Sequence, residues 1–81
     1  MLQGTQLSQS IEPEKVVISE YLEKFGAIAG RVVTEQMYSI YFEALEGVDL
    51  RRIEKGLKRY LQEGKRWPWP GELREFCEEE I

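Results

Sequence analysis

The sequence predicts an all-α protein, a small compact bundle of four helices with a loose N-terminal tail. Two observations support this fold class. Four segments repeat apolar residues with the 3.6-residue period of an amphipathic helix, and glycines or prolines separate them. A chain of 81 residues also has the length of a single domain. We expect a flexible tail over residues 1–11, a single helical domain over 12–81, no sheet, and helices near 13–25, 34–46, 49–63 and 70–79.

The first helix is expected to begin at Pro13, because the backbone N–H that proline lacks would be unpaired in a first turn anyway. Glu12 and Glu14 complement the positive end of the helix dipole. The apolar residues of this helix gather on one face: Val17, Ile18, Tyr21, Leu22 and Phe25. We expect the helix to stop at Gly26, and the segment AIAGRVV at residues 27–33 to connect it to the next helix.

The second helix is expected to start after the N-cap residue Thr34 and to end at Gly47. Its apolar residues cover an arc of roughly 200° around the helix axis. They are Met37, Tyr38, Ile40, Tyr41, Phe42, Ala44 and Leu45. An arc this wide is typical of a central helix that is contacted from two sides.

The third helix has the clearest amphipathic pattern, with Asp49 as its expected N-cap and Gly64 at its end. Its apolar stripe consists of Leu50, Ile53, Leu57, Tyr60 and Leu61. The opposite face carries Arg51, Arg52, Lys55, Lys58 and Arg59. We call these five residues the basic face, and they are candidate partner-binding residues.

The stretch RWPWPGELREF, residues 66–76, is predicted to be a rigid corner between the third and fourth helices. Each proline disfavours the helical conformation of the residue before it, so both tryptophans are expected to be extended. We expect Trp67 to seal the gap between the third and fourth helices, and Trp69 to be exposed and available to a partner. Pro70 begins the last helix, whose inner side is predicted to carry Leu73, Phe76 and Cys77.

The composition offers little material for catalysis. The chain has no histidine, which is the usual general base and the commonest metal ligand. Cys77 is the single cysteine, so it has neither a histidine to activate it nor a second thiol, and we expect it to be structural. There is also no glycine-rich phosphate loop. The sequence therefore predicts no enzyme activity, no catalytic residue, no metal and no cofactor.

A cytoplasmic location is expected, because one cysteine allows no internal disulfide. The first ten residues lack the basic and apolar regions of a signal peptide, and no apolar run has the roughly 18 residues that a membrane span needs.

The net charge of −4 conceals a strong asymmetry along the chain. Residues 50–66 carry a local charge of +5, and the rest of the chain carries −9. Three interpretations of the basic face remain open, namely a solvated helix surface, a site for an acidic protein, and a contact with DNA phosphates. The WPWP sequence could also be a proline-rich ligand, although such ligands usually have the pattern PxxP in a flexible segment.

Residues 34–77 carry a recognisable order of features. A helix with a YFEAL sequence leads into an Asp-capped helix with spaced Leu and Tyr, followed by an aromatic-Pro pair and a Pro-x-Glu-Leu sequence. The residues concerned are Tyr41, Phe42, Leu45, Asp49, Ile53, Leu57, Tyr60, Trp67, Pro68, Pro70, Glu72 and Leu73. This pattern resembles the phage replicative-helicase loader and inhibitor family of small helical proteins.

The resemblance implies a non-enzymatic contact with a protein partner, a replicative helicase or initiator, in phage or prophage DNA replication. Two alternatives stay open. One is a small DNA-binding regulator of the helix-turn-helix kind that uses the basic face, with nucleic acid as the less favoured partner. The other is a homodimeric helical module, because a small core and exposed aromatic residues favour self-association.

Overall fold

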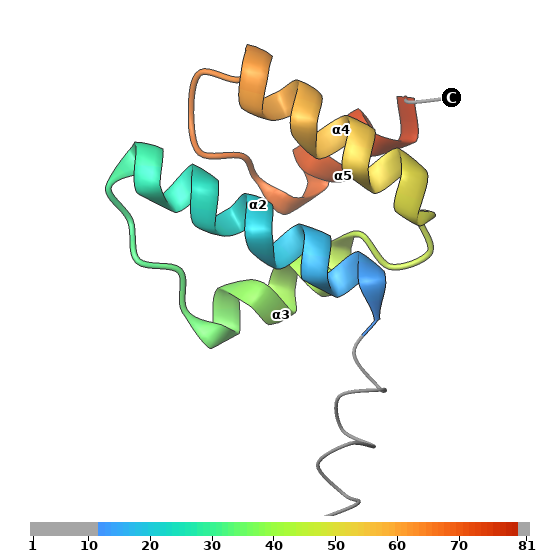
Figure 1. The fold of residues 1–81 in the computed structure, drawn as a ribbon, viewed down its shortest axis with the longest axis horizontal. Coiled ribbons are helices and arrows are strands. Elements are labelled where there is room, and N and C mark those ends of the chain that lie inside the picture. The colour runs from blue at the N-terminus through green and yellow to red at the C-terminus, as the bar shows by residue number, and fades with distance from the viewer. Residues whose placement is uncertain (1–11, 80–81) are drawn as a thin grey trace, which may run out of the picture.

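The computed structural model describes residues 12–79, which form four α-helices and, within that range, no strand. The helices are α2 (Pro13–Ala29), α3 (Glu35–Ala44), α4 (Leu50–Glu63) and α5 (Pro70–Glu79) (Figure 1). The predicted all-α fold is therefore confirmed. The predicted tail at residues 1–11 lies outside the described part of the chain.

The four helices enclose one core, and each helix packs against two others. Helix α2 lies between α3 and α4, and α5 closes the bundle by packing against both α4 and α3 (Figure 1). The second helix of the chain, α3, does contact two neighbours, but the interpretation of it as the central helix is wrong. Its ten residues bury only Tyr41, and Ile40 is 45% exposed. Contact with two neighbours does not distinguish α3, because every helix of the bundle has two, and the other apolar residues within α3 are only partly buried.

All four helices and the α3–α4 link contribute buried side chains to the core. Its buried members are Ile18, Leu22, Phe25, Tyr41, Leu45, Val48, Ile53, Leu57, Tyr60, Leu73 and Cys77. The predicted phase of α4 is confirmed, because Ile53 and Leu57 are at most 1% exposed, whereas Lys58 is exposed.

Helix α2 is longer than predicted, because it continues through Gly26 and ends at Ala29. The expectation that Gly26 stops the helix is wrong, and so is the assignment of residues 27–29 to the connector. A glycine inside a helix costs only about 1 kcal/mol. Here it allows the returning chain to approach closely, since a Cβ atom on Gly26 would lie 2.8 Å from the carbonyl oxygen of Arg31. The stop is Gly30, which has the left-handed backbone conformation (φ 70°) common after a helix.

The other helix boundaries follow the predicted caps. The Thr34 hydroxyl accepts a hydrogen bond from the Met37 N–H at 3.2 Å, and Asp49 accepts one from the Arg52 N–H at 2.9 Å. Helix α3 ends at Ala44, two residues earlier than expected, and a turn with Gly47 at φ 89° leads to α4. Gly64 follows α4 as predicted.

Two contacts hold α5 in place. The Arg74 guanidinium donates hydrogen bonds of 2.8 Å to the carbonyl oxygens of both Ala44 and Glu46, which satisfies acceptors that the end of α3 leaves free. Helices α4 and α5 also approach closely at Gly56, where a Cβ atom would lie 2.6 Å from the Cys77 sulfur. Cys77 is completely buried, as a structural cysteine is expected to be.

Candidate functional site

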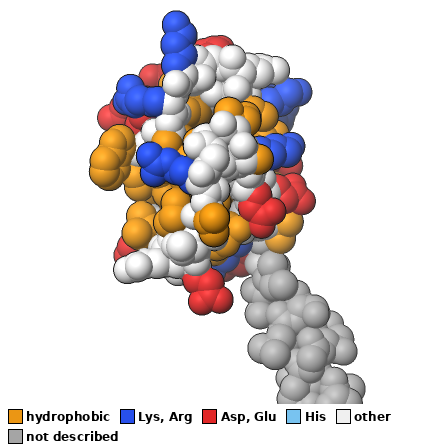
Figure 2. All heavy atoms as spheres, turned by 90° about the vertical axis from the view of Figure 1, so that its left-hand side faces the viewer, with side chains coloured by type: hydrophobic (Ala, Val, Ile, Leu, Met, Phe, Trp, Pro, Cys, Tyr) orange, Lys and Arg blue, Asp and Glu red, His pale blue; other side chains and the backbone are white. Residues whose placement is uncertain are grey.

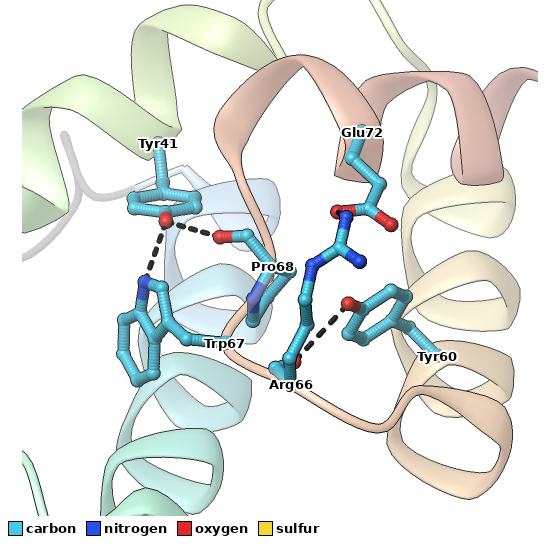
Figure 3. A network of polar contacts seen from close by, with 6 residues as sticks. All are labelled: Tyr41, Tyr60, Arg66, Trp67, Pro68 and Glu72. Carbon is cyan, nitrogen blue, oxygen red and sulfur yellow. Dashed lines mark hydrogen bonds and ion pairs between the residues drawn. The ribbon is translucent and has the colours of Figure 1, made fainter.

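The link between α4 and α5 is fixed by a tyrosine hydroxyl from α3. The Trp67 indole N–H donates a hydrogen bond of 2.8 Å to the Tyr41 hydroxyl, which in turn donates to the carbonyl oxygen of Pro68 (Figure 3). Pro68 is less than 2% exposed. The two prolines and this hydroxyl together hold the extended segment in one conformation.

The Trp67 ring covers the junction of α2 and α3. It makes edge-to-face contacts with Phe25 of α2 and Tyr41 of α3, with centroid distances of 6.5 and 6.4 Å. The prediction that Trp67 has a structural role is confirmed, but its predicted place between the third and fourth helices is wrong. The ring lies against α2 and α3 instead, where the Tyr41 hydroxyl accepts a hydrogen bond from its partly buried N–H. The Arg31 guanidinium carbon lies 5.3 Å from the ring centroid, so the α2–α3 link also contacts Trp67.

The same link is also tied to the end of α4. The Tyr60 hydroxyl donates a hydrogen bond of 3.1 Å to the carbonyl oxygen of Arg66, and the Arg66 side chain pairs with Glu72 at 3.0 Å (Figure 3). A Cβ atom on Gly64 would lie 2.5 Å from the Tyr60 ring. Only glycine therefore lets the chain turn this closely over the tyrosine.

Trp69 is 72% exposed, although it lies only two residues from the half-buried Trp67. The predicted exposure of Trp69 is confirmed. Two further apolar side chains are exposed on the α2–α3 link and the last turn of α2, namely Ile28 at 75% and Val32 at 84%. Among the described residues these three are the most exposed large hydrophobic side chains.

A hollow of about 270 Å³ lies beside Trp67, between the end of α2 and the α4–α5 link. We call it the Trp67 hollow. Its lining residues are Phe25, Ile28, Ala29, Tyr60, Leu61, Gly64, Lys65, Arg66, Trp67 and Pro68. Two of them are basic and none is acidic. Figure 2 views the molecule from the side of these two links and shows hydrophobic side chains among Lys and Arg side chains, with acidic side chains mainly toward the margins.

The predicted basic face on α4 is only partly free. Arg51, Lys55 and Lys58 are exposed, and within residues 12–79 they make no hydrogen bond or ion pair. Arg52 lies 3.7 Å from the Asp49 carboxylate of its own cap.

The placement of Arg59 on the basic face is wrong, because its side chain turns to α5. It donates to the Phe76 carbonyl oxygen at 3.4 Å, pairs with Glu79 at 3.1 Å and lies 4.2 Å from the Phe76 ring centroid. Within residues 12–79, Trp69 makes no hydrogen bond, ion pair or ring contact with the basic face.

A second, larger hollow of about 820 Å³ lies between the start of α2 and the α3–α4 link. Its lining includes five acidic residues and one lysine: Glu12, Glu14, Lys15, Glu43, Glu46 and Asp49. The two hollows therefore carry opposite charge.

The described residues offer few groups for chemistry. Within residues 12–79 no group of three or more His, Cys, Asp or Glu side chains is placed to hold a metal ion. Burial raises the pKa of Tyr41 and Tyr60 above the ordinary value of 10.0. The hydrogen bond to Glu23 raises the pKa of Tyr38. These three tyrosines therefore keep their protons at neutral pH.

None of the helices in residues 12–79 has the length and apolar character needed to cross a membrane.

Comparisons of the chain with protein-family models, curated proteins and solved structures find no match. The function must therefore be argued from this geometry and the sequence pattern.

Sequence reasoning identified both tryptophans but missed Ile28, Arg31 and Val32, which it assigned to a connector without a role. The segment AIAGRVV, residues 27–33, contains large apolar residues that belong to none of the predicted core stripes. This pattern could have indicated that these side chains are exposed.

Proposed function

We propose that this protein is a non-enzymatic protein-interaction module that binds its partner at the end of the bundle where the α2–α3 and α4–α5 links meet. The observation that carries the proposal is the exposure of three large apolar side chains, at 72–84%: Trp69 and Val32 on these links, and Ile28 in the last turn of α2. Single exposed apolar residues are common, but exposed tryptophan is a favoured anchor of protein interfaces.

The rigidity of the corner supports this role for Trp69. The neighbouring Trp67 and Pro68 are held by the Tyr41 hydroxyl, and Pro70 starts α5 directly afterwards. A side chain on a rigid segment loses little conformational entropy when it binds. Trp69 can therefore bind a partner with little loss of conformational entropy.

The partner that we propose is a replicative helicase or initiator of phage or prophage DNA replication. This choice rests on the sequence resemblance of residues 34–77 to the phage helicase loader and inhibitor family. A bacterial replicative helicase acts in the cytoplasm, so the choice agrees with the expected cytoplasmic location.

Binding to the replicative helicase of the bacterial host tests this function. We expect Trp69→Ala to weaken binding by about 2 kcal/mol, or roughly 30-fold, while leaving the melting temperature unchanged. Ile40→Ala is the matched control, because Ile40 is a partly exposed apolar residue on α3, outside the two links. Equal binding by both variants would contradict the role of Trp69, and no binding by the unmodified protein would refute the helicase as partner.

DNA is a second candidate partner, favoured by Arg51, Lys55 and Lys58, which are exposed and have no carboxylate partner within residues 12–79. A gel shift with duplex DNA, strengthened at low salt and lost when these three residues become alanine, would support it. Self-association through the exposed apolar residues is a third candidate. A sedimentation mass that rises with protein concentration would support it.

A further inference from the structure

We propose that the Trp67 hollow binds an acidic peptide segment of the partner, which inserts one large apolar side chain. This inference rests on the proposed function and deepens it, because it names the chemistry that the partner must present.

The volume and the apolar lining of the Trp67 hollow suit one inserted side chain. Phe25, Ile28, Leu61 and Trp67 give it an apolar lining, and its volume of about 270 Å³ lies just below the 300–1,000 Å³ of typical small-molecule sites. A leucine, methionine or phenylalanine side chain would be partly shielded from water there. In many interfaces a few side chains of this kind, each placed in a preformed pocket, supply most of the binding energy.

The charge around the hollow selects an acidic segment. Lys65 and Arg66 belong to its lining, and the Arg31 guanidinium lies against Trp67. Glu72 neutralises Arg66 at 3.0 Å, and within residues 12–79 Lys65 and Arg31 have no such carboxylate. Carboxylates that flank the inserted side chain would lie within the Debye length of about 10 Å at 0.1 M salt. A basic segment would instead be drawn to the acidic hollow at the start of α2.

Ring exposure argues for a peptide rather than single-stranded nucleic acid. Binding of bases depends on aromatic faces that are free for stacking. Phe25 and Tyr60 are only 6% and 4% exposed, and Arg31 covers one face of Trp67. The hollow therefore offers an apolar recess with a basic margin, in which the Phe25 and Tyr60 rings are not free for stacking and one face of Trp67 is covered.

Tryptophan fluorescence of the Trp69→Phe variant reports on the hollow directly, because Trp67 is then the only tryptophan. The probe is a synthetic peptide with one phenylalanine flanked on both sides by glutamates. One comparison peptide carries serine in place of phenylalanine, and another carries lysines in place of the glutamates. Oligo(dT) serves as the nucleic-acid comparison.

We expect the acidic phenylalanine peptide to shift Trp67 emission with saturation, and the serine peptide to bind about 30-fold more weakly. Lys65→Glu should weaken binding about fivefold at low salt and less at high salt, because the interaction is between exposed charges. Ile28→Ser should also weaken it, because the side chain lines the hollow. Lys58→Glu is the matched charge control on α4 and should change binding by less than about twofold. Both charge-reversed side chains are exposed, so each variant is expected to fold.

The inference is overturned if the acidic peptide does not bind, if the serine or lysine peptide binds equally well, or if only oligo(dT) binds. It is also overturned if Lys58→Glu weakens binding as much as Lys65→Glu. These outcomes are separable from failure of the proposed function. Helicase binding that depends on Trp69, without peptide binding, would retain the function and reject the hollow. Peptide binding without helicase binding would retain the hollow and reject that partner.

Discussion

The Tyr41 hydroxyl is the contact on which the geometry of the Trp-Pro corner most depends, and Tyr41→Phe removes it alone. The change deletes the acceptor of the Trp67 indole N–H and the donor to the Pro68 carbonyl oxygen. It leaves the phenyl ring in place, so the core keeps its apolar packing. The variant therefore isolates the polar bridge from the hydrophobic contribution of residue 41.

The expected loss of stability follows from the burial of the two groups left behind. A buried polar group without a partner costs about 1–3 kcal/mol. Pro68 is less than 2% exposed, so its carbonyl should incur a cost in that range, and the half-buried indole adds less. We expect Tyr41→Phe to lower the free energy of unfolding by about 2–4 kcal/mol. For a domain of this size, each kcal/mol lowers the melting temperature by about 4–8 °C.

Tyr38→Phe is the matched control on the same helix. The Tyr38 hydroxyl donates a hydrogen bond of 2.8 Å to Glu23, but that bond is exposed to water. We expect its loss to cost less than about 0.5 kcal/mol. Urea unfolding followed by circular dichroism measures both variants. If Tyr41→Phe proved as mild as Tyr38→Phe, the hydroxyl bridge would not be what fixes the corner.

Two further predictions concern packing and pH. Gly56→Ala should destabilise the protein by about 1–3 kcal/mol, because the new methyl group would overlap the buried cysteine of α5, including its backbone. Gly71→Ala is the control, because nothing lies within 4 Å of a Cβ atom at that position, and it should be neutral or stabilising by up to about 1 kcal/mol. Thermal melts measure both variants. If Gly71→Ala destabilised the protein more than Gly56→Ala, the close contact of α4 with α5 would be refuted. Because burial raises the pKa of Tyr41, the unfolded state loses its phenolic proton first, so the contribution of Tyr41 to the free energy of unfolding should be present below pH 10 and should be lost as the pH rises above it. Urea titrations across this range should show a smaller fall in Tyr41→Phe, and an identical fall would contradict the assignment.

The parts of the fold that could be predicted from sequence depend on signals only a few residues apart. Thr34 and Asp49 each bond an N–H three residues on, so their role as caps is visible in the local sequence. Pro70 likewise marks the start of α5. Gly26 was misread because its role depends on the returning Arg31 carbonyl, a contact made only after the chain has turned.

In the candidate site, the extended Trp-Pro corner could be predicted, because each proline restricts the residue before it. The different exposure of Trp67 and Trp69 does not follow from their spacing, since residues two apart on an extended segment lie on the same side of the chain. It depends on the contacts of Trp67 with Phe25 and Tyr41. The bridge through Tyr41 joins residues 26 apart in sequence, and no local pattern specifies it. Arg59 was assigned to the basic face from its helical phase, but its long side chain reaches Phe76 and Glu79 on another helix.

The central claim is that the end of the bundle at the two links is the binding surface. An amide and indole NMR titration of the protein with the acidic phenylalanine peptide, repeated with duplex DNA, tests it most directly. We predict that the peptide shifts the signals of residues 28–32 and 64–69, with the Trp67 indole among them, and leaves Arg51, Lys55 and Lys58 unchanged. Shifts confined to those three residues of α4, or produced by DNA and not by the peptide, would contradict it.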